Sequence, residues 1–189
     1  MTLNGLEEHH QILNSLYVQA CSDLLAAYGL TVHIREHRDD RGGPHMAVYM
    51  SILGAAGEGL RLSSTLKIDR DLVLNTHPLH SPEVLQDDLE DWCRELNNQL
   101  VGRVKNKLLG YGVEVTAGLP LLISGTDVVR LPEADSEVHA YCVESAHGQI
   151  ALTLTTLIAP EVEFHESEPP MDGEMNGEAV MAEGMIALF

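Results

Sequence analysis

Residues 91–108, Asp-Trp-Cys-Arg-Glu-Leu-Asn-Asn-Gln-Leu-Val-Gly-Arg-Val-Lys-Asn-Lys-Leu, form the stretch around which the rest of this chain is organised. At about 100° per residue, the apolar residues here and just upstream fall on one face of a helix. They are Leu85, Leu89, Trp92, Leu96 and Leu100. Another face carries Glu95, Asn98 and Gly102, with Asp91 close by. The stretch therefore predicts a helix that packs on one side and presents a carboxylate beside a carboxamide on the other.

The residues that flank this stretch predict a helix over 82–109. Ser81 offers an N-cap hydroxyl, and the proline after it lacks only a donor that the first helical position does not need. Glu83 places a negative charge at the positive end of the helix dipole. Gly110 and Gly112 follow the last periodic residue and end the helix.

The other predicted elements are a second long helix, a short helix and several strands. The long helix covers 3–28 and stops at Gly29. Residues 69–75 form a short helix or a strand, and the pattern favours the helix. Strands are predicted at 31–37, 46–53, 60–68, 113–117, 119–124, 138–145 and 149–159. Each long helix precedes antiparallel strands, which suggests an internal pseudo-duplication. This order indicates an α+β fold, with a largely antiparallel sheet and two long helices packed on one side.

Two local signals refine the predicted sheet. The glycine-rich stretch 54–59 is typical of a hairpin loop and joins the strands at 46–53 and 60–68. Pro120 interrupts the apolar run 119–124, and a proline cannot donate a hydrogen bond inside a sheet. The run is therefore predicted to lie at a sheet edge or at the start of a strand.

The charge of the chain limits its partners. There are 29 acidic and 11 basic residues, a formal net charge of −18. Nucleic acids and anionic membranes require clusters of Lys and Arg, so both are excluded as expected partners. The first ten residues show no basic region followed by a long apolar run, and no stretch is apolar enough for a membrane span. We expect a cytoplasmic protein.

Composition also divides the chain into two parts. Residues 1–160 are predicted to form one domain, large enough to bury a core without a stabilising disulfide. Residues 161–189 contain eight acidic residues and no Lys or Arg, which indicates a mostly disordered tail. The tail becomes apolar again over 181–189. This end is either a loosely docked terminus or a short peptide that binds a partner.

Cysteine and histidine usage gives no sign of a metal site. Three cysteines lie far apart within apolar patterns and are predicted to be buried free thiols: Cys21, Cys93 and Cys142. His77 and His80 have a suggestive spacing, but Pro78 between them disfavours a helix that would hold both side chains. We therefore expect no metal of the chain's own.

The stretch Glu95-Leu-Asn-Asn98-Gln-Leu-Val-Gly102-Arg-Val-Lys105 resembles the signature of the CheX branch of the CheC/CheX/FliY chemotaxis phosphatases. That branch carries Glu-x-x-Asn, a glycine four residues after the Asn, and a Lys three residues further on. Residues 115–125 are similar to the family's Ser-Leu-Pro-x-(Val/Ile)-x-Gly segment. CheC-type relatives carry a second Glu-x-x-Asn in the first helix, but Glu-Glu-His-His-Gln at 7–11 has no matching Asn. The resemblance therefore favours the CheX branch, with a single site.

The resemblance implies a phosphatase that acts on the phospho-aspartate of a CheY-like response regulator and ends a chemotaxis or two-component signal. In this reading, Asn98 orients the attacking water and Glu95 binds the regulator's active-site lysine. Asp91 and Gly102 contact the partner, and the Mg²⁺ belongs to the regulator. The resemblance also implies a homodimer formed by pairing sheet edges, at the edge near Leu122 or at the late hairpin.

Other interpretations of the same residues stay open at this point. A Glu and an Asn on an exposed helix face are most often only solvated, and Gly102 suits close packing against a strand as well as contact with a partner. The alternative function is a non-catalytic CheX-like module that docks a receiver domain or a flagellar-switch-like partner. A small-ligand or metal protein built on the histidines lacks the spacing that a metal site needs.

Overall fold

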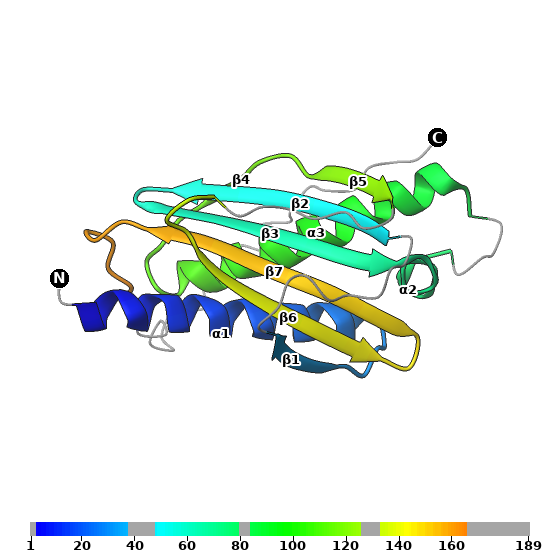
Figure 1. The fold of residues 1–189 in the computed structure, drawn as a ribbon, viewed down its shortest axis with the longest axis horizontal. Helices are drawn as coiled ribbons and strands as arrows, with labels where there is room; N and C mark the ends of the chain where they lie inside the picture. Colours follow the sequence, from blue (N-terminus) through cyan, green and yellow to red (C-terminus); the bar gives the residue numbers. More distant parts are fainter. Residues whose placement is uncertain (1–2, 38–47, 80–83, 126–132, 166–189) are drawn as a thin grey trace, which may run out of the picture.

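The computed structural model describes residues 3–37, 48–79, 84–125 and 133–165. Its helices are α1 (Leu3–Ala27), α2 (Arg70–Thr76) and α3 (Gln86–Leu109). Its strands are β1 (His33–His37), β2 (Val48–Gly57), β3 (Leu60–Asp69), β4 (Thr116–Ala117), β5 (Leu121–Gly125), β6 (Glu137–Ser145) and β7 (Gly148–Ile158). All strand pairs are antiparallel, in the order β1-β6-β7-β3-β2-β4, and β5 also pairs with β2 (Figure 1). The predicted α+β fold with an antiparallel sheet is confirmed.

The two long helices pack on the same face of the sheet (Figure 1). Tyr17 of α1 and Asn97 of α3 both hydrogen-bond to the Ser64 hydroxyl on β3, so both helices face the same side of that strand. Alternate residues of β3 and β7, such as Leu62 and Leu152, complete the core beneath them. Burial of this apolar surface is the main stabilising term for a domain of this size.

The start of α3 differs from the prediction. Ser81 and Pro82 lie outside the described residues, and the helix begins at Gln86, four residues later than expected. Leu85 takes the N-cap position with an extended backbone and no side-chain capping bond, and its side chain is 69 % exposed rather than part of the buried stripe. At the other end, Gly110 caps the helix and Gly112 has φ +70°, as the predicted stop requires.

The predicted hairpin loop at 54–59 is wrong for most of its length. β2 and β3 continue through it, and only Glu58 and Gly59 turn the chain, the latter with φ +71°. The small residues serve a different purpose, because the segment after α3 passes close beside β2. A Cβ on Gly57 would lie 1.9 Å from the carbonyl oxygen of Glu114. A side chain at this position would block the approach of that segment.

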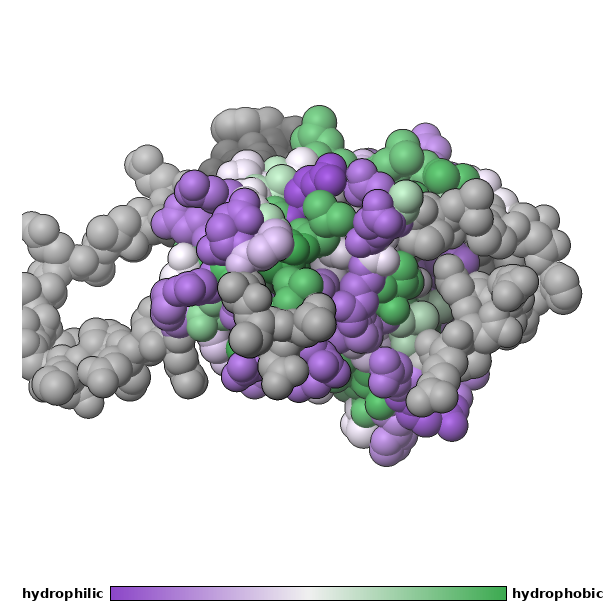
Figure 2. Space-filling model, turned by 60° about the vertical axis from the view of Figure 1, so that its left-hand side comes forward, coloured by the Kyte–Doolittle hydropathy of each residue, from purple (hydrophilic) through white to green (hydrophobic). Residues whose placement is uncertain are grey.

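The edge position predicted from Pro120 is confirmed, because β4 and β5 both lie beside β2 at one end of the sheet. Large apolar side chains at this edge are exposed: Leu119, Leu121 and Ile123. The late hairpin is not an edge, since β6 also pairs with β1 and β7 with β3. Figure 2 shows hydrophilic and hydrophobic residues interspersed over the described part of one face. The predicted homodimer stays a prediction, and among the described strands the proposed edge near β5 has no further neighbour, whereas the late hairpin has one on each side.

The chain continues on the surface of the domain beyond the predicted boundary at residue 160. Val162 is buried against Gly59, whose added Cβ would lie 2.3 Å from the valine Cγ2. Phe164 stacks on the His9 ring with a centroid distance of 4.7 Å. The backbone N–H of His165 donates to the carbonyl of Tyr111 at 3.1 Å. Residues 161–165 therefore dock on α1 and on the end of α3, and the rest of the predicted tail lies outside the described residues.

The cysteines are all free, but only two are buried as predicted. Burial raises the pKa of both Cys21 and Cys93 to about 12, so these thiols stay protonated near neutral pH. Cys142 is only partly buried, because it lies on the sheet face that the two long helices leave uncovered. His77 is buried, and its Nδ1 accepts a hydrogen bond from the Leu79 N–H at 3.2 Å. His80 lies outside the described residues.

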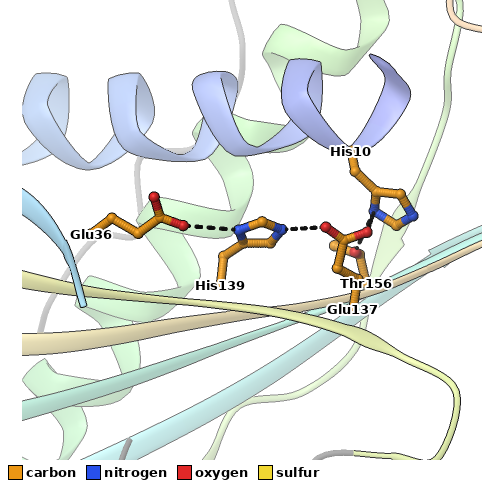
Figure 3. A network of polar contacts seen from close by, with 5 residues as sticks. All are labelled: His10, Glu36, Glu137, His139 and Thr156. Atoms are coloured by element: carbon orange, nitrogen blue, oxygen red, sulfur yellow. Dashed lines mark hydrogen bonds and ion pairs between the residues drawn. The ribbon is translucent and has the colours of Figure 1, made fainter. Parts of the chain in front are cut away.

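Polar contacts join the first half of α1 to three strands (Figure 3). The Nδ1 atom of His10 lies 3.0 Å from Thr156 Oγ1 on β7 and 3.0 Å from Glu137 Oε2 on β6. The other carboxylate oxygen of Glu137 is 2.7 Å from His139 Nε2, and His139 Nδ1 is 3.4 Å from Glu36 Oε1 on β1. This chain of contacts ties α1 to β7, β6 and β1.

We expect the free energy of unfolding to fall as pH decreases below about 6.5, in part because of His10. Burial lowers the His10 pKa, Glu137 partly offsets this, and His139 and His9 lower the pKa further. Between the lowered folded pKa and the unfolded value of 6.5, the unfolded chain binds more protons, so acid favours unfolding. Urea unfolding at pH 7.5 and 5.5 should show a smaller pH effect for His10→Asn than for wild type. Equal pH effects in the two proteins would contradict this assignment.

Candidate functional site

The centre of α3 is fixed to the sheet by a fully buried asparagine. Asn97 Nδ2 donates to the backbone carbonyls of Ser51 (3.0 Å) and Ser64 (3.2 Å), and its Oδ1 accepts from the Ser64 hydroxyl at 2.7 Å. The Ser64 hydroxyl in turn lies 2.8 Å from the hydroxyl of Tyr17. Because Ser64 donates to Asn97, the Tyr17 hydroxyl donates to Ser64. This network sets the rotation of α3 against β2, β3 and α1.

Sequence reasoning missed Asn97, although a signal was present. Asn97 lies four residues after Cys93 and three before Leu100, so it falls on the apolar face of the helix. A polar residue in such a position needs buried hydrogen-bond partners. The next residue, Asn98, points about 100° away from Asn97 around the helix axis and is exposed.

Glu95 and Asn98 lie side by side on the exposed face of α3. Asn98 Nδ2 donates to Glu95 Oε2 at 3.3 Å. The second carboxylate oxygen, Oε1, accepts from Gln99 Nε2 at 2.9 Å, a contact that the sequence pattern did not indicate. Glu95 is half-buried and Asn98 is exposed. The carboxylate is thus held in one orientation while the amide next to it remains accessible.

Asp91 and Gly102 extend the same face in both directions. Asp91, one turn before Glu95, is exposed and forms an ion pair with Arg94. Around Gly102, one turn after Asn98, no atom of the described residues lies within 4 Å of the position of an added Cβ. The alternative in which Gly102 makes room for a strand is therefore wrong. The absent side chain leaves a flat, open part of the helix beside Asn98.

The side chains on this face can position a water molecule and bind a positive charge, but none of them is an activated nucleophile. The nearest thiol, Cys93, points to the core, and burial keeps its pKa at about 12. An amide both donates and accepts hydrogen bonds, so it can hold a water molecule without a shifted pKa. A carboxylate beside it can bind an ammonium group. Because the site lies on a convex helix, it needs a partner to surround the reacting atoms.

Two further properties concern metals and membranes. In the part of the chain that the structure describes, no three His, Cys, Asp or Glu side chains are grouped so that they could hold a metal ion. Among the described helices, none combines the length and the apolar character needed to cross a membrane.

The buried His77 packs against the Trp92 ring in a T-shaped contact, with a centroid distance of 5.6 Å, and so has a packing role.

Solved structures with the same fold are found among chemotaxis proteins. The CheX protein from Vibrio vulnificus is 18 % identical, with a TM-score of 0.66 over 76 % of this chain and 98 % of that one. CheX in the CheX–CheY–BeF3–Mg²⁺ complex from Borrelia burgdorferi is 16 % identical, with a TM-score of 0.58 over 76 % and 96 %. The FliM middle domain from H. pylori is 13 % identical, with a TM-score of 0.54 over 83 % and 94 %.

A family model connects the sequence itself to this group. The model described as chemotaxis phosphatase CheX matches residues 49–143, about half of the chain. The matched segment spans the strands that anchor α3 and the whole of α3, including Glu95 and Asn98. No curated protein matches the chain. The resemblance stated from the motif around α3 is confirmed, and the chain belongs to the CheX family of chemotaxis phosphatases.

Proposed function

We propose that this protein hydrolyses the phospho-aspartate of a CheY-like receiver domain. Asn98 places the attacking water, and Glu95 binds the lysine of the receiver's active site. The observation that carries this proposal is the pairing of Glu95 and Asn98, 3.3 Å apart on an exposed face of a helix whose rotation is fixed by buried hydrogen bonds. The CheX family supports a phosphatase reaction, and the Borrelia complex contains a CheX bound to CheY.

The reaction requires accurate placement more than chemical activation. The water oxygen attacks phosphorus, the bond from phosphorus to the aspartyl oxygen breaks, and inorganic phosphate and the free carboxylate result. Water must lie in line with the breaking bond, and the charge on the phosphoryl oxygens must be stabilised. The Asn98 carboxamide can orient that water through its donor and acceptor atoms. The Mg²⁺ is expected to belong to the receiver, as the composition of the Borrelia complex suggests.

Glu95 contributes by docking. A receiver lysine that pairs with this carboxylate fixes how deeply α3 enters the receiver's site and so fixes the position of Asn98. Such a pair becomes stronger when the interface excludes water. Asp91, one turn earlier on the same face, is exposed and paired with Arg94, and in the proposed complex it contacts the receiver.

The direct test measures phosphate release from a phosphorylated receiver domain. This protein is added at one tenth of the receiver's molar concentration. We expect release faster than the receiver's intrinsic rate, with several turnovers per protein molecule, and loss of this acceleration when EDTA removes Mg²⁺ after the receiver has been phosphorylated. A release rate that stays at the intrinsic value, even when this protein is added in excess over the receiver, would overturn the proposal.

The second candidate is a docking module without catalysis, which the likeness to the FliM middle domain favours at the level of fold. It predicts binding to a receiver with no acceleration of phosphate release. The intact Glu95 and Asn98 pair favours the enzyme. Binding measured on the same samples as phosphate release separates the two functions.

Gly102→Ala is expected to stabilise the free protein while weakening docking. Alanine in an exposed helix is favoured over glycine by about 1 kcal/mol, and its Cβ would meet no atom of the described part of the chain. In the complex, the extra methyl group would hold the receiver's backbone away and raise KM about tenfold, as overpacking commonly costs 1–3 kcal/mol.

The matched control for this prediction is Gly112→Ala. Gly112 has φ +70°, so alanine there should destabilise the protein, and KM should stay unchanged because the residue lies past the end of α3. A Gly102→Ala protein that is more stable but has an unchanged KM would show that the partner does not approach this part of the helix.

A further inference from the structure

The carboxylate of Glu95 is connected to α1 through two side chains. Its Oε1 atom accepts from Gln99 Nε2 at 2.9 Å, and Gln99 Oε1 accepts from the Tyr28 hydroxyl at 2.8 Å. Tyr28 follows the last turn of α1, where its N–H donates to the carbonyl of Leu25 at 3.1 Å. Its ring meets the Trp92 ring edge-on, with a centroid distance of 5.6 Å. The hydroxyl is therefore held by a backbone turn and by an aromatic contact.

The orientation of the Gln99 amide follows from these partners. An ionised carboxylate only accepts hydrogen bonds, so the NH₂ group of Gln99 must face Glu95. The amide oxygen then faces Tyr28, which donates to it. Each group has one role that satisfies both neighbours, and a flipped amide would place its oxygen against the carboxylate. The contacts therefore form a directed relay from Tyr28 through Gln99 to Glu95.

We propose that Gln99 and Tyr28 are positioning residues that preset the Glu95 carboxylate for docking the receiver; this rests on the proposed function. A free glutamate side chain samples many rotamers, and ordering it on binding lowers affinity. The relay orders Glu95 before the partner arrives. Neither Gln99 nor Tyr28 needs to touch the receiver for this effect.

The same helix contains a second relay of identical composition that serves as an internal control. The Tyr49 hydroxyl donates to Gln86 Oε1 at 2.9 Å, and Gln86 Nε2 donates to Glu90 Oε1 at 3.1 Å. Glu90 lies more than one turn before Glu95, and its other carboxylate oxygen is 4.0 Å from Arg94. Each tyrosine-to-phenylalanine change removes one hydroxyl from one relay, but only one relay ends at the docking carboxylate.

The experiment compares Tyr28→Phe with Tyr49→Phe in the full chain. Both changes remove one oxygen and keep the ring. For Tyr28→Phe we expect KM for the phosphorylated receiver to rise about three- to tenfold, with kcat within about twofold of wild type. For Tyr49→Phe we expect both constants to be unchanged. Equal KM values for the two variants, or a loss confined to kcat, would overturn the proposal.

A second measurement does not depend on catalysis. NMR relaxation of the Gln99 side-chain NH₂ group should report a rigid amide in wild type and in Tyr49→Phe. In Tyr28→Phe the same measurement should report a mobile amide. If Gln99 stays ordered without the Tyr28 hydroxyl, the positioning proposal fails whatever the activity. If instead wild type releases no phosphate and binds no receiver, the proposed function fails, and the docking role of the relay fails with it even when the NMR result is as expected.

Discussion

Asn98→Ala is expected to slow phosphate release at saturating receiver by about a hundredfold or more. In the proposed reaction this side chain alone orients the attacking water, and misplacement of a reacting group by about 1 Å typically costs that much. KM should rise much less than kcat falls, because Gln99 still holds the Glu95 carboxylate that carries the docking contact. Single-turnover and steady-state phosphate release by the purified variant, with a phosphorylated receiver, measure the two constants separately.

Controls for this prediction exist within the chain. Asn98 is exposed and its side chain makes a 3.3 Å hydrogen bond to Glu95 at the surface, so alanine, a better helix former, should not lower the thermal stability. Asn75→Ala changes an exposed asparagine in α2 and should leave kcat and KM at wild-type values. Wild-type kcat in Asn98→Ala would remove the enzymatic role of this face and leave only docking.

Asn97→Leu is expected to cost about 3 kcal/mol of unfolding free energy, although leucine has the same branched shape and suits a helix. The change removes every bond to the Asn97 amide, which donates to two backbone carbonyls and accepts from Ser64 inside the core. Buried polar groups that lose a partner cost about 1–3 kcal/mol each. Urea unfolding monitored by the single tryptophan, Trp92, gives the free energy directly.

The control for this second prediction is Asn106→Leu in the same helix. Asn106 is exposed, so the same chemical change should alter stability by no more than about 0.5 kcal/mol. Equal losses in the two variants would mean that the buried network does not stabilise α3. Together with the Asn98→Ala result, these two variants would show that Asn97 stabilises the fold and that the adjacent Asn98 serves the reaction.

Much of the fold follows from local patterns. The 3.6-residue periodicity placed α1 within one residue of its observed end at Ala27, and the alternation at 138–159 predicted the β6–β7 hairpin. Glu95 and Asn98 are three residues apart, so any helix through them brings their side chains together. The spacing alone is equally typical of solvated residues, and it was the resemblance of residues 95–105 to the CheX signature that predicted a site here.

Other features depend on segments that are distant in sequence. The extension of β2 through Gly57 reflects the approach of residues 114–118, which the composition of the hairpin alone did not indicate. The pairing with β4 thus outweighed the turn preference of the glycine-rich stretch. The start of α3 at Gln86, without a side-chain cap, also differs from the prediction, and Ser81 lies outside the described residues.

The helix at 91–108 has some properties that its local sequence sets and others that depend on tertiary contacts. Its sequence by itself determined that it is helical and that Glu95, Asn98 and Gly102 share a face, because spacing along a helix sets side-chain direction. Only the tertiary structure decided that this face is exposed, that Asn97 holds its rotation through Ser64, and that Gln99 connects Glu95 to Tyr28. The physical reason is distance along the chain: the first relation spans a few residues, whereas Asn97 and Ser64 are 33 residues apart and Tyr28 and Gln99 are 71 apart, so they meet only when the core has formed.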